Sequence, residues 1–104
     1  MKYISTRNNS VEYNFEQVFI KGLADDGGLF VPKEVKKYSA TEIKALSNLS
    51  YQNLAKEIIY PFLGDFMTVD ELSDVVDKSY SVFRKDNAVD LIKAGDTKIL
   101  ELFH

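Results

Sequence analysis

Residues 14–22 read NFEQVFIKG and contain the signals that start, support and end an α-helix. Asn14 is a residue type that favours the position before the first turn, and Gln17 stands where a capping box needs an amide or carboxylate side chain. Phe15, Val18 and Phe19 are apolar residues at helical spacing, and Gly22 follows them as a residue type that commonly ends a helix. The stretch therefore predicts a helix that begins near Phe15.

The same capping pattern occurs twice more along the chain. Ser39 is followed by Glu42, and Thr68 is followed by Glu71. Each pair supplies a hydroxyl before the first turn and a carboxylate at its third residue, so each reads as the start of a helix. The predicted helices begin near Ala40 and Val69.

A fourth helix is predicted between these two. Ser50 can cap it, so it should begin near Tyr51, and Pro61 must kink or tighten its final turn before Gly64 ends it. The last helix, in turn, has apolar residues at helical spacing as far as Phe83. Such a stripe is typical of core packing rather than of ligand binding.

Strand signals are short and lie near both ends of the chain. Four segments rich in aromatic or branched residues are Tyr3–Ser5, Leu29–Val31, Val89–Ile92 and Lys98–Phe103. We expect an α+β fold in which about four helices pack on one short sheet that contains the first and the last strand. The sequence has no repeat, low-complexity stretch or linker, so residues 1–104 are expected to form a single domain.

Composition is that of an ordinary globular protein, with 45% hydrophobic and 28% charged residues. The net charge of -3 is small and the charges are interspersed, which does not favour nucleic acid or a membrane surface as a partner. The first residues have no apolar core of signal-peptide length and no apolar run is long enough to span a membrane. A cytoplasmic location is expected, and the absence of cysteine excludes disulfides and thiolate metal sites.

Groups able to carry out catalysis are scarce. One histidine cannot form a His-rich metal site, and the sequence contains neither a Gly-rich phosphate loop nor a nucleophile-elbow serine. The acids around the last helix lack the ligand spacing and central glycine of a calcium loop, and they fit a helix N-terminus. They are Asp65, Asp70, Glu71, Asp74 and Asp77. No catalytic residue and no metal site are therefore expected within the chain.

Three further features leave alternatives open. Asp25-Asp26-Gly27-Gly28 predicts a tight turn, or a place where a ligand or a neighbouring domain approaches the backbone closely. Lys33, Lys36 and Lys37 form a basic cluster that either keeps a loop soluble or contacts a phosphate. The terminal His104 is either a packed or solvated side chain or a functional one.

The chain ends on an apolar run, Lys98 to Phe103, with no polar tail after it. Such an end predicts an element whose continuation is missing, and hence a fragment of a longer protein. Because successive side chains of a strand alternate, Ile99 and Leu100 point to opposite faces, and both faces need cover. We expect the helices of this chain to cover one face and a missing domain to cover the other.

Several stretches in this order resemble the amino-terminal domain of threonine synthase. They are KYISTRN, FEQVFIKGLADDGGLFVPKEV, LSYQNLAKEIIYPFLGD, SYSVFR and ILELFH. The resemblance spans nearly the whole chain and is most specific at Lys21 to Pro32 and at Glu101 to His104. In that family the last motif leads into Gly-Pro-Thr and then Phe-Lys-Asp. Asn8 departs from the glycine that often follows STR in the family.

The resemblance implies the front part of a fold type II pyridoxal-phosphate enzyme that converts O-phospho-L-homoserine and water to L-threonine and phosphate. The lysine that holds the cofactor as a Schiff base would lie beyond His104, so the chain alone would be inactive and bind no cofactor. Its partners would be the missing cofactor-binding domains. Phe103 and His104 are the candidates for positions near the cofactor cleft, with no proton-transfer role assigned to either.

A different class of protein is the alternative. Without the resemblance, the same residues would describe a small α+β module that binds another protein through the open face or edge of its last strand. The reading frame after His104 distinguishes the two hypotheses, because the enzyme requires it to continue into Gly-Pro-Thr and Phe-Lys-Asp.

Overall fold

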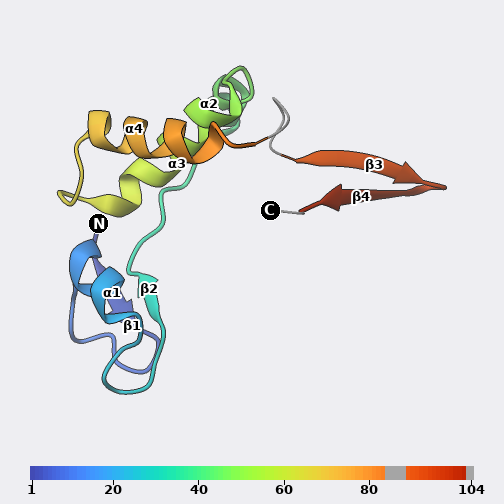
Figure 1. Cartoon of the computed structure of the whole chain (residues 1–104). Helices are drawn as coiled ribbons and strands as arrows, with labels where there is room; N and C mark the ends of the chain where they lie inside the picture. Colours follow the sequence, from blue (N-terminus) through green and yellow to red (C-terminus); the bar gives the residue numbers. More distant parts are fainter. Residues whose placement is uncertain (84–88, 103–104) are drawn as a thin grey trace.

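The computed structural model describes residues 1–83 and 89–102. Helices and strands alternate in the first part, three helices follow one another in the middle, and a strand pair closes the described chain (Figure 1). In chain order the elements are β1 (Tyr3–Ser5), α1 (Phe15–Lys21), β2 (Phe30–Pro32), α2 (Ala40–Leu46), α3 (Tyr51–Leu63), α4 (Val69–Tyr80), β3 (Asp90–Ala94) and β4 (Thr97–Glu101). The predicted α+β class, with four helices, is confirmed.

All four helices begin at the residues that the capping patterns predict. In α1, α2 and α4 the reciprocal capping box is formed, by Asn14 with Gln17, Ser39 with Glu42 and Thr68 with Glu71. In α3 the Ser50 side chain accepts a hydrogen bond from the Asn53 backbone. These side chains satisfy backbone N–H groups that have no partner within the helix, which fixes where each helix starts.

The last helix is shorter than predicted. The helix ends at Tyr80 rather than continuing to Phe83, because Ser81 caps it. The Ser81 hydroxyl donates a 2.7 Å hydrogen bond to the Lys78 carbonyl. The Phe83 ring nevertheless packs edge-on against Tyr80, with 4.7 Å between the ring centroids. The apolar stripe therefore extends past the helix, whereas the helical backbone does not.

The prediction that the first and last strands share one sheet is wrong. β1 pairs with β2, and β3 pairs with β4, in two separate antiparallel pairs. The free edge of β1 is engaged locally, because Tyr3 and Tyr13 exchange two backbone hydrogen bonds of 2.9 Å. β3 and β4 are joined by the two residues Gly95 and Asp96, so they pair with each other as a hairpin.

The described core lies where α3 and α4 pack side by side (Figure 1). Leu63, Leu72 and Val76 are buried together, and partly buried side chains from α1, α3, α4 and the α3–α4 loop surround them. These are Phe15, Ala55, Met67 and Tyr80. The α3–α4 pair thus supports the position of α1 and of the β1–β2 pair beside it.

The hairpin of β3 and β4 extends away from the helices (Figure 1). Leu91 is 60% exposed and Leu100 on the opposite strand is 52% exposed. The expectation that the helices of this chain cover one face of the last strand is therefore wrong. The apolar residues of α4 that are buried, Leu72 and Val76, pack against Leu63 of α3 and not against the hairpin.

Candidate functional site

Both residues proposed for the cofactor cleft, Phe103 and His104, lie outside the described residues. The remaining candidates are the glycine turn, the basic cluster, the acids of α4 and two cavities. The contacts of each indicate whether its polar groups are engaged within the fold or open to a partner.

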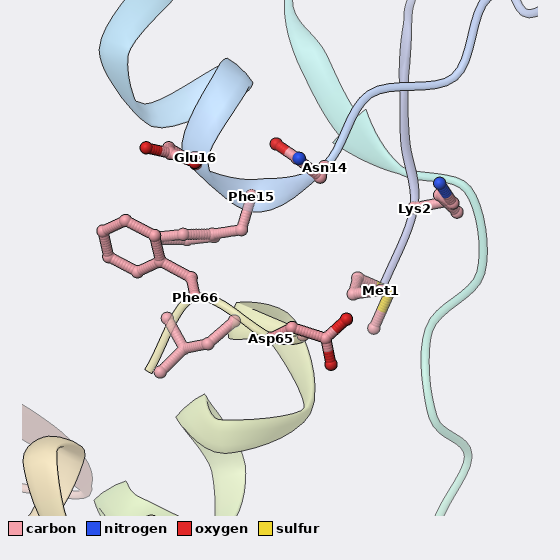
Figure 2. A pocket seen from close by; sticks show the side chains of 9 residues that line it. Met1, Lys2, Asn14, Phe15, Glu16, Asp65 and Phe66 are labelled. Atoms are coloured by element: carbon pink, nitrogen blue, oxygen red, sulfur yellow. The ribbon is translucent and has the colours of Figure 1, made fainter. Parts of the chain in front are cut away.

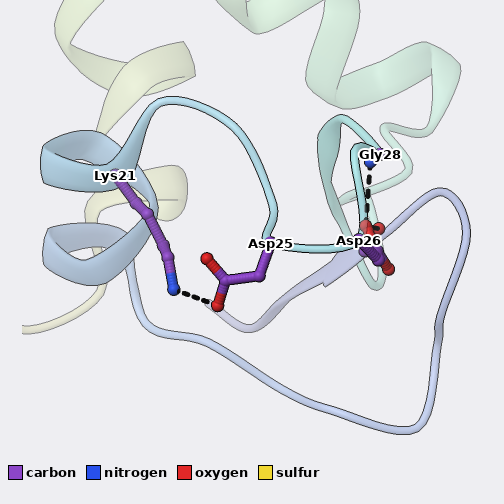
Figure 3. A network of polar contacts seen from close by, with 5 residues as sticks. Lys21, Asp25, Asp26 and Gly28 are labelled. Atoms are coloured by element: carbon purple, nitrogen blue, oxygen red, sulfur yellow. Dashed lines mark hydrogen bonds and ion pairs between the residues drawn. The ribbon is translucent and has the colours of Figure 1, made fainter.

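The Asp25–Gly28 segment forms a tight turn held by its own side chains. The Asp26 carboxylate accepts a 2.8 Å hydrogen bond from the Gly28 backbone (Figure 3). It accepts another of 2.8 Å from the Ser5 hydroxyl. These two bonds, the first above all, lower the pKa of Asp26 below its usual value. Asp25 instead forms an ion pair with Lys21, with 2.5 Å between their charged atoms (Figure 3).

Arg7 closes this turn from the side of β1. Its backbone N–H donates to the Ser5 hydroxyl at 3.1 Å, and its guanidinium donates to the Asp26 carbonyl at 3.1 Å. A Cβ at Gly28 would lie 2.2 Å from the Ser5 oxygen, so only glycine fits beside this side chain. The polar atoms of the turn bind one another, which supports the tight-turn interpretation over a ligand site.

Two of the three lysines of the basic cluster have separate contacts within the chain. Lys33 forms an ion pair with Glu12, and Lys36 lies 4.6 Å above the centre of the Tyr38 ring. The pKa of Glu12 is lowered and that of Lys33 is raised, in each case mainly by their mutual hydrogen bond. The geometry thus favours the interpretation of a charged loop surface over a phosphate site.

The acids around α4 serve the helix and its neighbours. Glu71 accepts from the Thr68 backbone and hydroxyl, which lowers its pKa, and Asp77 forms a 2.8 Å ion pair with Lys56 of α3. Asp74 lies 3.7 Å from Lys78, one turn along the helix. Within residues 1–83 and 89–102, no group of three His, Cys, Asp or Glu residues could hold a metal ion.

A small polar cavity of about 300 Å³ separates the start of the chain from the α3–α4 loop. Figure 2 shows Lys2 and Asp65 on one side of it, with the rings of Phe15 and Phe66 close together on the other. The two rings pack with their centroids 5.1 Å apart, so they join α1 to the loop that follows α3. This cavity has charges of both signs and no arrangement typical of an acid–base pair.

An apolar groove of about 460 Å³ runs between α1, α3 and α4. Phe19 on its α1 side is 68% exposed and Val75 on its α4 side is 47% exposed. The other lining residues are Phe15, Ile59, Leu63, Phe66, Met67, Leu72, Val76, Ser79, Tyr80 and Phe83. The sequence predicted that the apolar stripe of the last helix packs in the core. The groove itself was not predicted, because it forms where α1, α3 and α4 meet, and no local sequence pattern shows that meeting. The apolar lining of the groove suits contact with another apolar surface.

None of the helices in the described part of the chain is long and apolar enough to cross a membrane. What the described surfaces define is a small α+β domain whose apolar groove and hairpin face outward. The sequence profile of the family described as Threonine synthase N terminus matches residues 2–80. The chain therefore belongs to the threonine synthase N-terminus family.

Individual relatives agree with the family. The chain is similar over its whole length to threonine synthase of Pseudomonas aeruginosa, at 36% identity, and covers 22% of that protein. It is 38% identical to threonine synthase of Schizosaccharomyces pombe, covering 21% of it, and 38% identical to the mouse protein threonine synthase-like 2, covering 22%. The chain thus spans about a fifth of the length of the curated relatives it matches.

Solved structures show the same arrangement. The whole chain superposes with a TM-score of 0.91 on the pyridoxal-phosphate-bound threonine synthase from Brucella melitensis, at 35% identity and covering 23% of that chain. The TM-score with threonine synthase from Escherichia coli is 0.84, at 26% identity and again 23% of that chain. The resemblance to threonine synthase and the assignment to its amino-terminal domain are therefore confirmed.

The starts of the described helices are engaged by side chains of the chain itself. The N-terminus of each described helix, where a phosphate group would find backbone donors, is already capped by a side chain of the same chain. The caps are Asn14, Ser39, Ser50 and Thr68. No step of a cofactor reaction is therefore assigned to this part of the molecule.

Proposed function

We propose that this chain is the amino-terminal domain of a longer, pyridoxal-phosphate-dependent threonine synthase. The full-length protein would convert O-phospho-L-homoserine and water to L-threonine and phosphate, as a carbon–oxygen lyase that acts on a phosphate ester. The observation that carries the proposal is the superposition of the whole chain, at a TM-score of 0.91, on a threonine synthase whose structure contains the cofactor.

The part played by this domain would be structural. Its polar clusters are engaged internally, whereas the groove around Phe19 and Val75 is exposed. Burying such apolar surface stabilises a complex, so the groove suits contact with the cofactor-binding domains of the same polypeptide. We expect Phe103 and His104 to lie near the cofactor cleft, and the Schiff-base lysine to follow them. A cytoplasmic location is part of the same proposal and accords with a sequence without cysteine.

The test compares the full-length protein with the 104-residue chain. Both are incubated with pyridoxal phosphate, reduced with borohydride and digested, and the modified lysine is located by mass spectrometry. We expect stoichiometric labelling of one lysine beyond His104 in the full-length protein and no specific labelling within the 104-residue chain. Stoichiometric labelling of a single lysine within residues 1–104 would contradict the proposal.

A reading frame that stops at His104 would instead favour the small protein-interaction module. The exposed hairpin, with Leu91 and Leu100 open to solvent, is the feature that such a module would use. Continuation of the frame into Gly-Pro-Thr and Phe-Lys-Asp would exclude this alternative.

A further inference from the structure

The register of the hairpin sorts its side chains into two different faces. Leu91 lies opposite Leu100, and Lys93 lies opposite Lys98. Because directly opposed residues share a face and alternate residues return to it, these four side chains form one face, here called the lysine face. Ile92 and its partner Ile99 lie on the other face.

Both faces carry exposed apolar side chains. Leu91, Leu100, Ile92 and Ile99 are between 43% and 60% exposed. A two-stranded hairpin is marginally stable in water by itself, and strands that are apolar on both faces are typical of sheets covered on both sides. The hairpin is therefore built to be covered by more protein than the described helices supply.

The lysine face also carries an unfavourable pair. Lys93 and Lys98 are directly opposed, and like charges in this position destabilise a hairpin. Neither lysine forms an ion pair with any other residue that the structure describes. A partner with carboxylates near the hairpin turn would convert this repulsion into attraction.

We propose that the lysine face docks on an apolar surface bordered by carboxylates, and that this surface belongs to the same polypeptide after residue 104. This inference rests on the proposed function. The length of the relatives supports the choice of occupant, since the chain covers 22% of the Pseudomonas aeruginosa protein. The superposition on the Brucella melitensis enzyme covers the whole chain, so the extended hairpin is part of an arrangement shared with a much longer protein.

A second copy of the chain fits less well. The acids of the hairpin strands, Asp90 and Glu101, oppose each other in the register and lie on the face that Ile92 and Ile99 share. A contact of the lysine face with itself therefore brings lysines together and offers them no carboxylate from either strand. Such a contact would add repulsion between lysines, whereas carboxylates on the proposed surface would attract them.

The test compares how Lys98→Glu changes amide hydrogen exchange of the hairpin in the 104-residue chain and in the full-length protein. In the 104-residue chain, glutamate would face Lys93, so amide hydrogen exchange of the hairpin should slow by about two- to fivefold. In the full-length protein the attraction of the glutamate to Lys93 remains, but repulsion from the carboxylates of the docking surface should outweigh it, so exchange of the same amides should accelerate by about two- to fivefold. Lys98→Arg keeps the charge and should behave as the wild type in both.

The matched control is Lys37→Glu, an exposed lysine outside the hairpin, which should leave hairpin exchange unchanged in both proteins. Slower or unchanged exchange for Lys98→Glu in the full-length protein would overturn the inference, even if the 104-residue chain fails to fold. Protection of the wild-type hairpin that rises with concentration of the 104-residue chain would show a second copy and overturn it as well. If the full-length protein makes threonine and Lys98→Glu does not change hydrogen exchange of its hairpin, this inference alone is refuted. If the full-length protein makes no threonine, the proposed function is refuted.

Discussion

The hydroxyl of Tyr3 donates a 2.7 Å hydrogen bond to the backbone carbonyl of Phe62. Phe62 lies in the last turn of α3, where backbone carbonyls have no partner within the helix. The Tyr3 side chain therefore caps a helix that is distant in sequence, and it fastens β1 to the helical part of the domain. Burial of the ring also raises the pKa of its hydroxyl.

Replacing Tyr3 with phenylalanine removes this bond and keeps the ring that packs near Phe15. We expect the free energy of unfolding to fall by about 1 kcal/mol, because a helix-end carbonyl loses its partner. Urea denaturation followed by circular dichroism measures the change. Tyr60→Phe, at a ring that is 39% exposed, is the matched control and should cost much less. Equal losses for the two variants would show that the Tyr3–Phe62 bond does not stabilise the fold.

Gly28→Ala places a Cβ 2.2 Å from the Ser5 hydroxyl oxygen, so the turn or β1 must shift. Overpacking of this kind costs about 1–3 kcal/mol. Ser5→Ala removes the clashing oxygen, although it also removes the hydrogen bonds to Asp26 and Arg7. The double variant should therefore lose less stability than the sum of the two single losses. Strictly additive losses would mean that the contact between these residues does not limit position 28.

The lowered pKa of Asp26 predicts a dependence of stability on pH. Since the folded state holds the pKa of this carboxyl below the ordinary value of 3.8, the ionised group stabilises the fold above that pH. This contribution is lost as the pH falls through the folded-state pKa. Between about pH 5 and about pH 2, the wild type should lose more stability than Asp26→Asn, which has no carboxyl to protonate. Glu12, Glu42 and Glu71 remain in both proteins, so parallel curves would contradict the role of Asp26.

Thr68→Ala removes the side chain that accepts from the Glu71 backbone at the start of α4. A lost N-cap costs about 1 kcal/mol, and α4 supplies the buried residues Leu72 and Val76. We expect the midpoint of thermal unfolding to fall for Thr68→Ala and to recover for Thr68→Ser, which restores a hydroxyl. A midpoint as low for serine as for alanine would show that the hydroxyl is not the group that matters.

The helices could be predicted because their signals are local. Ser39 and Glu42 are three residues apart, and the bond between them forms whenever the helix starts there. The arrangement of the strands could not be predicted, because the choice of Tyr13, Pro32 or a later strand as the partner of Tyr3 depends on contacts distant in sequence. Strand signals describe a segment and do not identify its partner.

The functional surfaces divide in the same way. The Asp25–Gly28 turn was predicted from residue types, because aspartate and glycine act on their own backbone. The groove lined by Phe19 and Val75 was not, because it forms only where α1 meets α3 and α4. The like-charged pair of Lys93 and Lys98 needed the register of the hairpin, which a sequence does not display.

The most direct measurement of the central claim is turnover by the full-length protein that contains this chain. Supplied with pyridoxal phosphate and O-phospho-L-homoserine, it should release L-threonine and inorganic phosphate in equal amounts, and the 104-residue chain should release neither. A full-length protein that binds the cofactor and forms no threonine from this substrate would contradict the assignment.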